Sequence, residues 1–136
     1  MENTKANIIE FPKIYDSRGS LSVIENFKQL PFAIKHTRWI YGMPSGSSQN
    51  GYALRTQNQL IVALSGSCDV TTCDGDCEQA FHLQCASQAL LLPAMTWRSI
   101  GNFSTNTVLL ILSSGEDCPE EYIYDKNSLI SPEHNE

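Results

Sequence analysis

The most informative segment of the chain is Gly46-Ser-Ser-Gln-Asn-Gly-Tyr52-Ala-Leu54-Arg-Thr-Gln-Asn-Gln59-Leu-Ile-Val-Ala-Leu-Ser-Gly66. Its second half, from Gln59 to Ser65, is an apolar run closed by a glycine, which is typical of a buried strand that ends in a turn. Tyr52 and Leu54 are two positions apart, so on a strand both side chains point to one face. The segment therefore predicts a buried strand preceded by two side chains that share a surface.

Size and charge limit the classes of protein that fit this chain. Its 136 residues suffice for one domain with a single core, and 41% of them are hydrophobic. A net charge of −6 without a basic run argues against a nucleic-acid partner. No stretch approaches a membrane span, and the first residues have no apolar run of signal-peptide length. Because the five cysteines are an odd number, we expect reduced thiols and a cytoplasmic location.

Short strand-like runs separated by turn residues occur along the chain. We expect strands at 8–14, from 21 onward, and at 31–41, 67–72, 78–83, 88–93 and 107–113. Pro12 confines the first to an edge or a bend, and Asp74-Gly75 is the pair of a hairpin turn. No segment has a helical period over more than two turns. The pattern predicts an all-β antiparallel sandwich or barrel over residues 1–125, such as a jelly roll, followed by a polar tail over 126–136.

The opening segment resembles the first signature motif of the cupin family. In that motif a Gly is followed by His-x-His, then by a Glu, and then by a second Gly. Gly46 and Gly66 stand at the two ends here, whereas Tyr52, Leu54 and Gln59 replace the two histidines and the glutamate. The resemblance implies that the frame of the motif is kept while its usual chemistry is not.

A second motif, Pro-x-Gly-x-x-His-x-x-x-Asn in cupins, resembles residues 93–102. Pro93 and Asn102 match, Met95 replaces the glycine, and Arg98 replaces the histidine. The two motifs, in order and with a short hairpin between them, imply a cupin jelly-roll barrel.

A narrower resemblance runs from residue 8 to residue 123. The chain looks like the WxcM-like cupins, which are dTDP-sugar 3,4-ketoisomerases. The stretches that carry the likeness are Asp16-Ser-Arg18-Gly19-Ser-Leu21, Pro31-Phe32-Ala-Ile34-Lys35, Leu64-Ser-Gly66-Ser67, Asp74-Gly75, Pro93-Ala-Met-Thr-Trp97-Arg98, Asn102-Phe103-Ser104 and Tyr122-Ile123. This resemblance implies a homodimer that moves the carbonyl of dTDP-4-keto-6-deoxyglucose from C4 to C3 and needs no metal or other cofactor.

The catalytic strand departs from that family. Where the family has Arg-Gly-x-His-Ala-His-Arg or -Lys, this chain has Gln49-Asn-Gly-Tyr52-Ala-Leu54-Arg55. Moving the ketone requires a base that takes a proton from the neighbouring carbon, and an imidazole with a pKa of about 6.5 suits this. Leu54 cannot act as a base, because its side chain has no ionisable group. A phenol such as that of Tyr52 can donate a proton, but with a reference pKa of about 10 it is a poor base unless a cation such as Arg55 or Arg98 lies beside it.

Other side chains are candidates for the missing chemistry and for ligand binding. His36 lies on the strand at 31–41, and alternation allows it to face either the cavity, as a substitute acid–base group, or the surface or a dimer interface. Trp97 would stack on a base or sugar ring, or belong to the core. Arg98 would pair with phosphate oxygens.

The remaining candidates are weaker, and the four motif positions together argue against a metal. Arg18 is a ligand contact or a structural ion-pair partner of Asp16. Arg38 and Arg55, together with Gln59 from the first motif, complete the predicted substrate-binding set. A site made of Tyr52, Leu54, Gln59 and Arg98 suits no first-row metal, because an arginine is permanently charged.

Three functional hypotheses remain open at this point. The first is a binding protein for a dTDP-sugar or similar anionic small molecule, related to the ketoisomerases but without their standard chemistry. The second is an active, metal-independent sugar-nucleotide isomerase or epimerase that uses Tyr52 or His36. The third is a dimeric scaffold.

Overall fold

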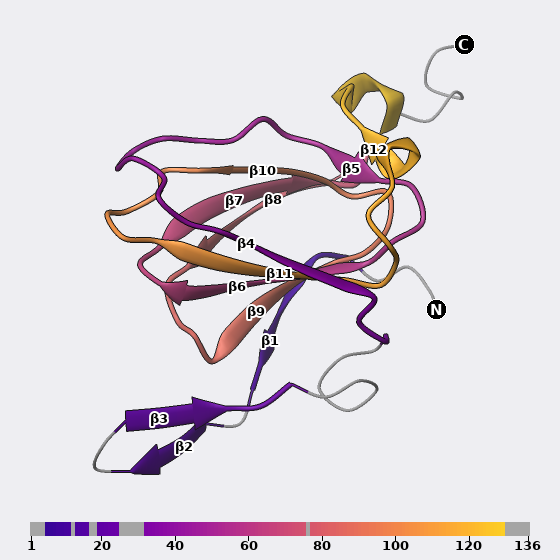
Figure 1. Cartoon of the computed structure of the whole chain (residues 1–136). Coiled ribbons are helices and arrows are strands. Elements are labelled where there is room, and N and C mark those ends of the chain that lie inside the picture. The colour runs from indigo at the N-terminus through magenta and orange to yellow at the C-terminus, as the bar shows by residue number, and fades with distance from the viewer. Residues whose placement is uncertain (1–4, 12, 17–18, 25–31, 76, 130–136) are drawn as a thin grey trace.

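Two antiparallel sheets face each other in the body of the protein (Figure 1). The computed structural model of the chain describes residues 5–11, 13–16, 19–24, 32–75 and 77–129. The larger sheet has the order β1-β9-β6-β11-β4, formed by Asn7–Glu10, Gln88–Leu92, Gln59–Ser65, Val108–Ser113 and His36–Ile40. The smaller has the order β10-β7-β8, formed by Trp97–Gly101, Cys68–Cys73 and Glu78–Leu83. This is the predicted all-β jelly roll.

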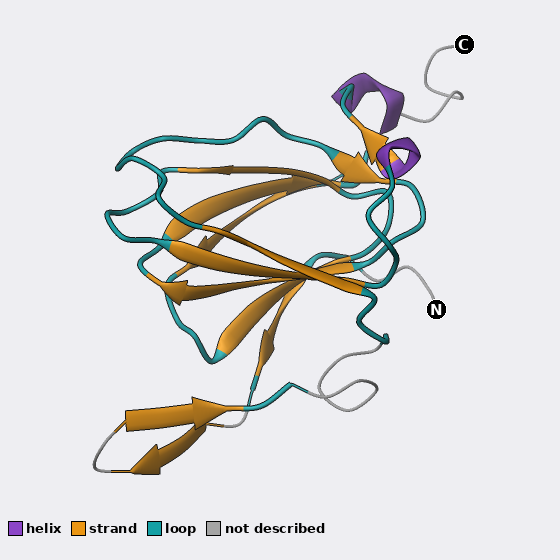
Figure 2. Cartoon of the chain, viewed as in Figure 1, coloured by secondary structure: helices purple, strands orange, loops and turns teal. Residues whose placement is uncertain are grey.

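Two small ribbons complete the described structure. β5 (Ala53–Leu54) pairs with β12 (Tyr122–Ile123), and β2 (Lys13–Asp16) pairs with β3 (Gly19–Ser22) in a hairpin that projects from the two sheets (Figure 1). Helical structure among the described residues is limited to two short 3-10 turns, η1 (Pro119–Glu121) and η2 (Lys126–Leu129), near the C-terminus (Figure 2). Of the expected polar tail, residues 130–136 lie outside the described part.

The core between the sheets follows from strand alternation. In β6, Ile61 and Ala63 point inward, and Ile111 of β11 lies directly opposite Ile61. They pack against Val70 and Ile100 of the smaller sheet. The apolar run at 59–65 is nearly continuous because the other face of the larger sheet is covered too.

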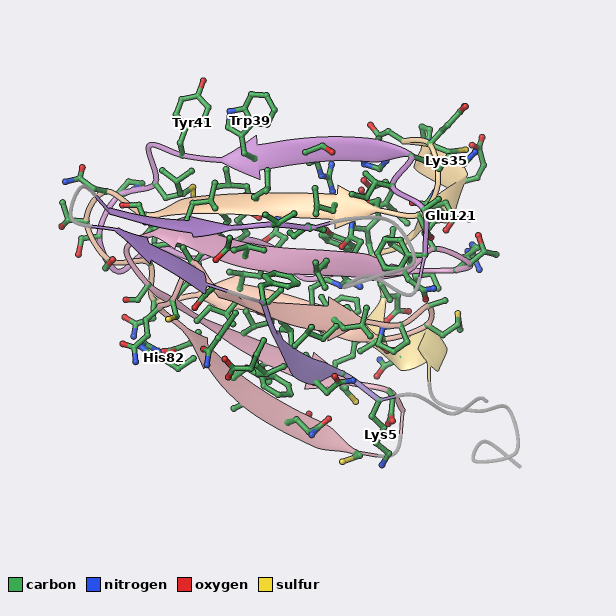
Figure 3. All side chains as sticks on the ribbon, turned by 90° about the horizontal axis from the view of Figure 1, so that it is seen from below. Lys5, Lys35, Trp39, Tyr41, His82 and Glu121 are labelled. Carbon is green, nitrogen blue, oxygen red and sulfur yellow. The ribbon has the colours of Figure 1, made fainter. Side chains whose placement is uncertain are left out.

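A second apolar layer lies on the outer face of the larger sheet. Leu60 and Val62 of β6 point that way and pack with Phe11 and Phe32, which are 6% exposed. This apolar layer does not extend to the edge of the sheet that is formed by β4. Trp39 and Tyr41, on and just after the edge strand β4, are 59% and 69% exposed and project side by side (Figure 3).

The strand expected at 31–41 was too long. β4 begins only at His36, because Phe32 packs onto the outer face of the sheet instead of continuing in its plane. The run at 78–83 matches β8 residue for residue. β10 and β12 were not expected as strands, and Pro12 lies outside the described residues.

The two cupin-like motifs have left-handed backbone at the positions where cupins favour glycine or asparagine. Gly66 has φ +73°, and a Cβ there would lie 2.5 Å from Thr107 Oγ1. Met95 and Asn102 have φ values of 63° and 55°. Met95 therefore adopts the conformation of the glycine that it replaces, which is unfavourable for an L-residue with a side chain.

Candidate ligand pocket

A pocket of about 460 Å³ lies beside the inner face of the larger sheet, next to the ribbon of β5 and β12. Its lining comes from β4, β11, the loop before β5 and the segment that includes η1 and β12. The lining residues are Arg38, Ile40, Gln49, Tyr52, Ile111, Asp117, Pro119, Tyr122 and Tyr124. Charge, phenol groups and aliphatic surface thus meet in one place, as is usual for small-molecule sites.

Tyr52 is positioned by backbone pairing with the second motif. Its N–H donates to Arg98 O at 3.0 Å, and Arg98 N–H donates to Tyr52 O at 2.9 Å. The preceding residue must be small, because a Cβ on Gly51 would lie 2.5 Å from the indole ring of Trp97. The glycine thus lets this segment approach β10, so that the pairing aligns the residues of the two motifs.

A polar network connects the pocket to the core. Arg38 Nη2 donates to Tyr52 Oη at 3.3 Å, and Tyr52 Oη donates to Gln59 Oε1 at 3.4 Å. The same Gln59 oxygen accepts from Arg98 Nη1, while Gln59 Nε2 donates to Ser113 Oγ at 2.9 Å. Gln59 is therefore the centre of the network, and it is completely buried.

Arg98 lies behind Tyr52 and is nearly inaccessible. It is 1% exposed, and its Cζ is 4.7 Å from the centroid of the Tyr52 ring. Nη2 donates to Thr96 O at 3.2 Å, whereas Nε is buried and has no hydrogen-bond partner. Burial lowers the pKa of Arg98 from its ordinary value, because desolvation disfavours the charged form.

Three tyrosines form an aromatic wall on the pocket. The rings of Tyr52 and Tyr122 are 5.1 Å apart, and those of Tyr122 and Tyr124 are stacked 5.8 Å apart with planes inclined by 8°. Tyr122 Oη donates to Asp117 Oδ1 at 3.0 Å. Burial, helped by Asp117 and opposed by Arg38, raises the pKa of Tyr122 to about 12. At neutral pH this phenol is a hydrogen-bond donor and not a base.

The structure brings together four of the predicted site residues and separates others from them. Tyr52, Gln59, Arg38 and Arg98 form the network described above. Arg55 does not line the pocket: it is exposed, and its Nε donates to Glu120 O at 3.1 Å.

Trp97 does not line the pocket either, because its ring packs against Ala53 and Ile123. Its position favours the core alternative over ring stacking with a ligand. Arg18 lies outside the described residues.

His36 lies near the network but not on the pocket. It pairs across the sheet with Ser113, which in turn pairs with Gln59, so the three side chains share the inner face. Its Nδ1 donates to Gly115 O at 2.6 Å, because a carbonyl can only accept. The other nitrogen, Nε2, is buried and has no partner. The side chain of His36 therefore points to the inner face of the sheet and not to the protein surface.

The motif positions at which cupins hold a metal do not offer a suitable donor set in this chain. Tyr52 and Gln59 are engaged with each other, Arg98 brings a positive charge, and Leu54 has no donor atom. Among the residues that the structure describes, no three His, Cys, Asp or Glu side chains converge.

Sequence reasoning missed the contribution of the C-terminal segment. Tyr122 was noted only as part of the family likeness, and Asp117 and Tyr124 were not considered. They reach the pocket because β12 pairs with β5, with Tyr122 opposite Leu54. A two-residue strand far along the chain has no periodicity of its own, so only the density of tyrosines at 122–124 hinted at it.

Comparison with known proteins gives consistent matches over nearly the whole chain. A model of the FdtA family, described as WxcM-like, C-terminal, matches residues 4–133. The TDP-4-oxo-6-deoxy-alpha-D-glucose-3,4-oxoisomerase of Aneurinibacillus thermoaerophilus is 34% identical over 123 residues, which cover 90% of this chain and 86% of that protein.

Solved structures of similar proteins agree with the family match. The WlaRB TDP-quinovose 3,4-ketoisomerase from Campylobacter jejuni superposes with a TM-score of 0.88 at 30% identity, covering 92% of this chain and 96% of that one. A mutant of the 3,4-ketoisomerase QdtA from Thermoanaerobacterium thermosaccharolyticum, in complex with TDP-4-keto-6-deoxyglucose, gives 0.89 at 26% identity, covering 95% and 94%.

Fold and comparisons together place the protein among the cupin-type relatives of sugar-nucleotide isomerases. More narrowly, the chain belongs to the WxcM-like FdtA family, and the solved structures similar to it include several 3,4-ketoisomerases. No helix in the described residues is long and apolar enough to cross a bilayer.

Proposed function

We propose that this chain binds a dTDP-sugar or a closely similar anionic small molecule in the pocket lined by Arg38, Tyr52 and Tyr122, and that it does not isomerise the sugar at the rate usual for its family. One observation carries the proposal: the described lining of the pocket contains no histidine. Tyr52 and Leu54 occupy the two positions where the family motif has its imidazoles.

The reaction itself explains why this matters. A 3,4-ketoisomerase removes the proton on C3 of a 4-keto sugar, passes through an enediol, and returns a proton to C4. A suitable base must have a pKa near the working pH. Tyr122 is unsuited because its raised pKa keeps it protonated, and Leu54 has no ionisable group.

The ligand class is supported by the pocket and by the relatives. Arg38 gives the wall a positive charge, and the tyrosine rings offer flat surfaces for a base or a sugar. Solved relatives are complexes with TDP and with TDP-4-keto-6-deoxyglucose. We extend their ligand class, and not their activity, to this protein.

Two measurements test the proposal. Thermal-shift titration with dTDP and dTDP-glucose should raise the melting temperature, because a ligand that binds only the folded state stabilises it. NMR of dTDP-4-keto-6-deoxyglucose mixed with the protein should show no family-like conversion. Rapid conversion would refute the loss of activity, and absence of any shift with the nucleotides would refute the ligand class.

The double substitution Tyr52→His with Leu54→His is the sharper experiment. If the rest of the pocket is intact, restoring both imidazoles should raise isomerisation above the wild-type level. Either single substitution is the matched control, since the family motif uses the pair.

A second candidate function is an active isomerase or epimerase that uses His36 or Tyr52. The buried, unpartnered Nε2 of His36 favours it, because with the proton on Nδ1 that nitrogen is an acceptor. His36→Gln and Tyr52→Phe distinguish the two functions. Turnover that either substitution abolishes would support the enzyme, whereas turnover insensitive to both would exclude these residues as the acid–base group.

We further propose a cytoplasmic homodimer. The outer face of the larger sheet exposes Trp39, Tyr41 and Leu64, and a second copy of the chain would cover such a surface. No disulfide joins the five cysteines, all of which lie in the described part of the chain, and this fits a reducing compartment. Light scattering should give twice the chain mass, and Trp39→Glu should shift it toward the monomer. A monomeric wild type would contradict the proposal.

A further inference from the structure

Arg98 has a positive charge that no acidic side chain among the described residues neutralises. No ion pair in the described part of the chain includes it. Its two side-chain nitrogens with partners donate to the uncharged oxygens of Gln59 and Thr96. The pocket carboxylate of Asp117 accepts from Tyr122 instead. A buried cation without a counter-charge is costly, and such groups concentrate at functional sites.

A second cation lies on the other side of Tyr52. Arg38 donates to the Tyr52 phenol at 3.3 Å, and its Cζ is 5.6 Å from the centroid of the Tyr122 ring. It lines the pocket directly. No ion pair includes Arg38 among the described residues. Two guanidinium groups therefore flank one phenol ring, and within the described part of the chain neither is paired with a carboxylate.

Tyr52 separates the pocket from the buried cation. Tyr52 lines the pocket and Arg98 does not, although the ring is only 4.7 Å from the Arg98 guanidinium. The phenol is held by hydrogen bonds of 3.3 and 3.4 Å, which are longer than well-formed ones. These hydrogen bonds hold the hydroxyl weakly, so the ring is retained mainly by its contacts with the Arg98 guanidinium and the Tyr122 ring. A bound oxyanion would replace the first of these contacts with charge-assisted hydrogen bonds.

We propose that Arg38 and Arg98 together form a subsite for an oxyanion of the ligand, a phosphoryl or carboxylate group, which is reached when the Tyr52 ring turns aside. Guanidinium groups bind such oxyanions through pairs of N–H donors, and the Arg98 Nε–H has no other partner. The inference rests on the proposed function, because it takes this pocket as the ligand site, and it adds the chemistry of the group that binds there.

Gln59 offers a direct test, because Gln59→Glu changes charge without changing shape. A carboxylate at this position would accept from Arg98 Nη1, Tyr52 Oη and Ser113 Oγ, and would neutralise the buried cation. We expect the unliganded variant to melt about 4 °C higher than wild type. We also expect it to bind inorganic pyrophosphate or glucuronate at least about tenfold more weakly, equivalent to about 1.4 kcal/mol. Stability and anion affinity should therefore change in opposite directions.

Two further variants complete the experiment. Gln84→Glu adds the same charge at an exposed position beyond β8, and its affinity for the anion should equal that of wild type. Arg38→Met removes the cation on the pocket wall and should weaken anion binding about tenfold as well. Calorimetric titrations with pyrophosphate and with glucuronate, alongside neutral thymidine and glucose, show which oxyanion the subsite prefers.

The outcomes separate this inference from the proposed function. Equal anion affinities of wild type and Gln59→Glu, or no binding of either anion by wild type, would overturn the subsite. If dTDP binds both proteins equally, the nucleotide-sugar function stands and the subsite fails. If pyrophosphate binds in a Gln59-dependent manner while dTDP does not bind, the subsite stands and the nucleotide ligand fails.

Discussion

The ring of Tyr52 lies over the guanidinium group of Arg98 with 4.7 Å between ring centroid and Cζ, while their backbones exchange hydrogen bonds of 3.0 and 2.9 Å. One residue comes from each of the two cupin-like motifs. Two replacements that look independent in the sequence are thus in direct contact. The phenol and the guanidinium form one cation–π unit at two positions where the general cupin motifs have histidines.

Substitutions at Tyr52 should separate the roles of its ring and its hydroxyl. Tyr52→Phe loses only long hydrogen bonds and should cost less than about 1 kcal/mol of unfolding free energy. Tyr52→Ala also removes the cover of Arg98 and should cost about 2–4 kcal/mol. Urea unfolding of both variants measures this. Equal losses would mean that the hydroxyl, and not the ring, stabilises the arrangement.

Met95→Gly should stabilise the protein, which is unusual for a change to glycine. Met95 has φ 63° and is 42% exposed, so the substitution relieves left-handed backbone and removes little packing. We expect a gain of up to about 1 kcal/mol, offset in part by the greater freedom of glycine in the unfolded chain. Met95→Ala is the control, because alanine keeps the unfavourable conformation. A glycine variant less stable than the alanine variant would contradict this account.

The raised pKa of Tyr122 makes a prediction about alkaline pH. Folding favours the neutral phenol, so its contribution to stability is fully present below pH of about 10 and is lost as the pH rises through about 12. After a rapid pH jump, the tyrosinate absorbance of the folded protein should include a late step near pH 12. Tyr122→Phe should remove that step. A wild-type titration complete near pH 10 would contradict the burial of this phenol.

The thiol of Cys68 should be slow to react. Burial, with a smaller effect of Asp69, raises the pKa of Cys68 to about 11, and its side chain is inaccessible in the core. At pH 8 only about one in a thousand such thiols is ionised, and the thiolate is the reactive form. Mass spectrometry after brief iodoacetamide treatment should find Cys68 unlabelled. In urea all five cysteines should react, and labelling of native Cys68 as fast as Cys77 would contradict its burial.

Strand positions could be predicted where hydrophobic pattern and turn residues coincide. β8 was located to the residue, and the apolar run from Gln59 is a strand buried on both faces. The start of β4 was misplaced, because local β propensity cannot show that Phe32 leaves the sheet plane to cover its outer face. Packing between distant segments decides such boundaries.

In the candidate site, too, some residues could be predicted from the sequence and others could not. Tyr52, Gln59 and Arg98 could be found by motif spacing, because two cupin-like frames put them at defined strand positions. Arg38 was a weak candidate for ligand binding, because nothing in the sequence distinguishes it from an arginine on a solvent-exposed strand face. Trp97 ranked high, yet packs in the core, since the close approach of Gly51 is visible only in three dimensions.

By itself the sequence determined the jelly-roll class, the family likeness and the absence of histidines from two motif positions, because all three follow from residue identity and spacing along the chain. Only the tertiary structure decided that Tyr52 covers Arg98, that Gln59 connects them, and that the C-terminal tyrosines complete the pocket wall. The physical reason is that these contacts join residues between 7 and 70 positions apart, whose meeting depends on strand register and sheet closure and not on any local preference.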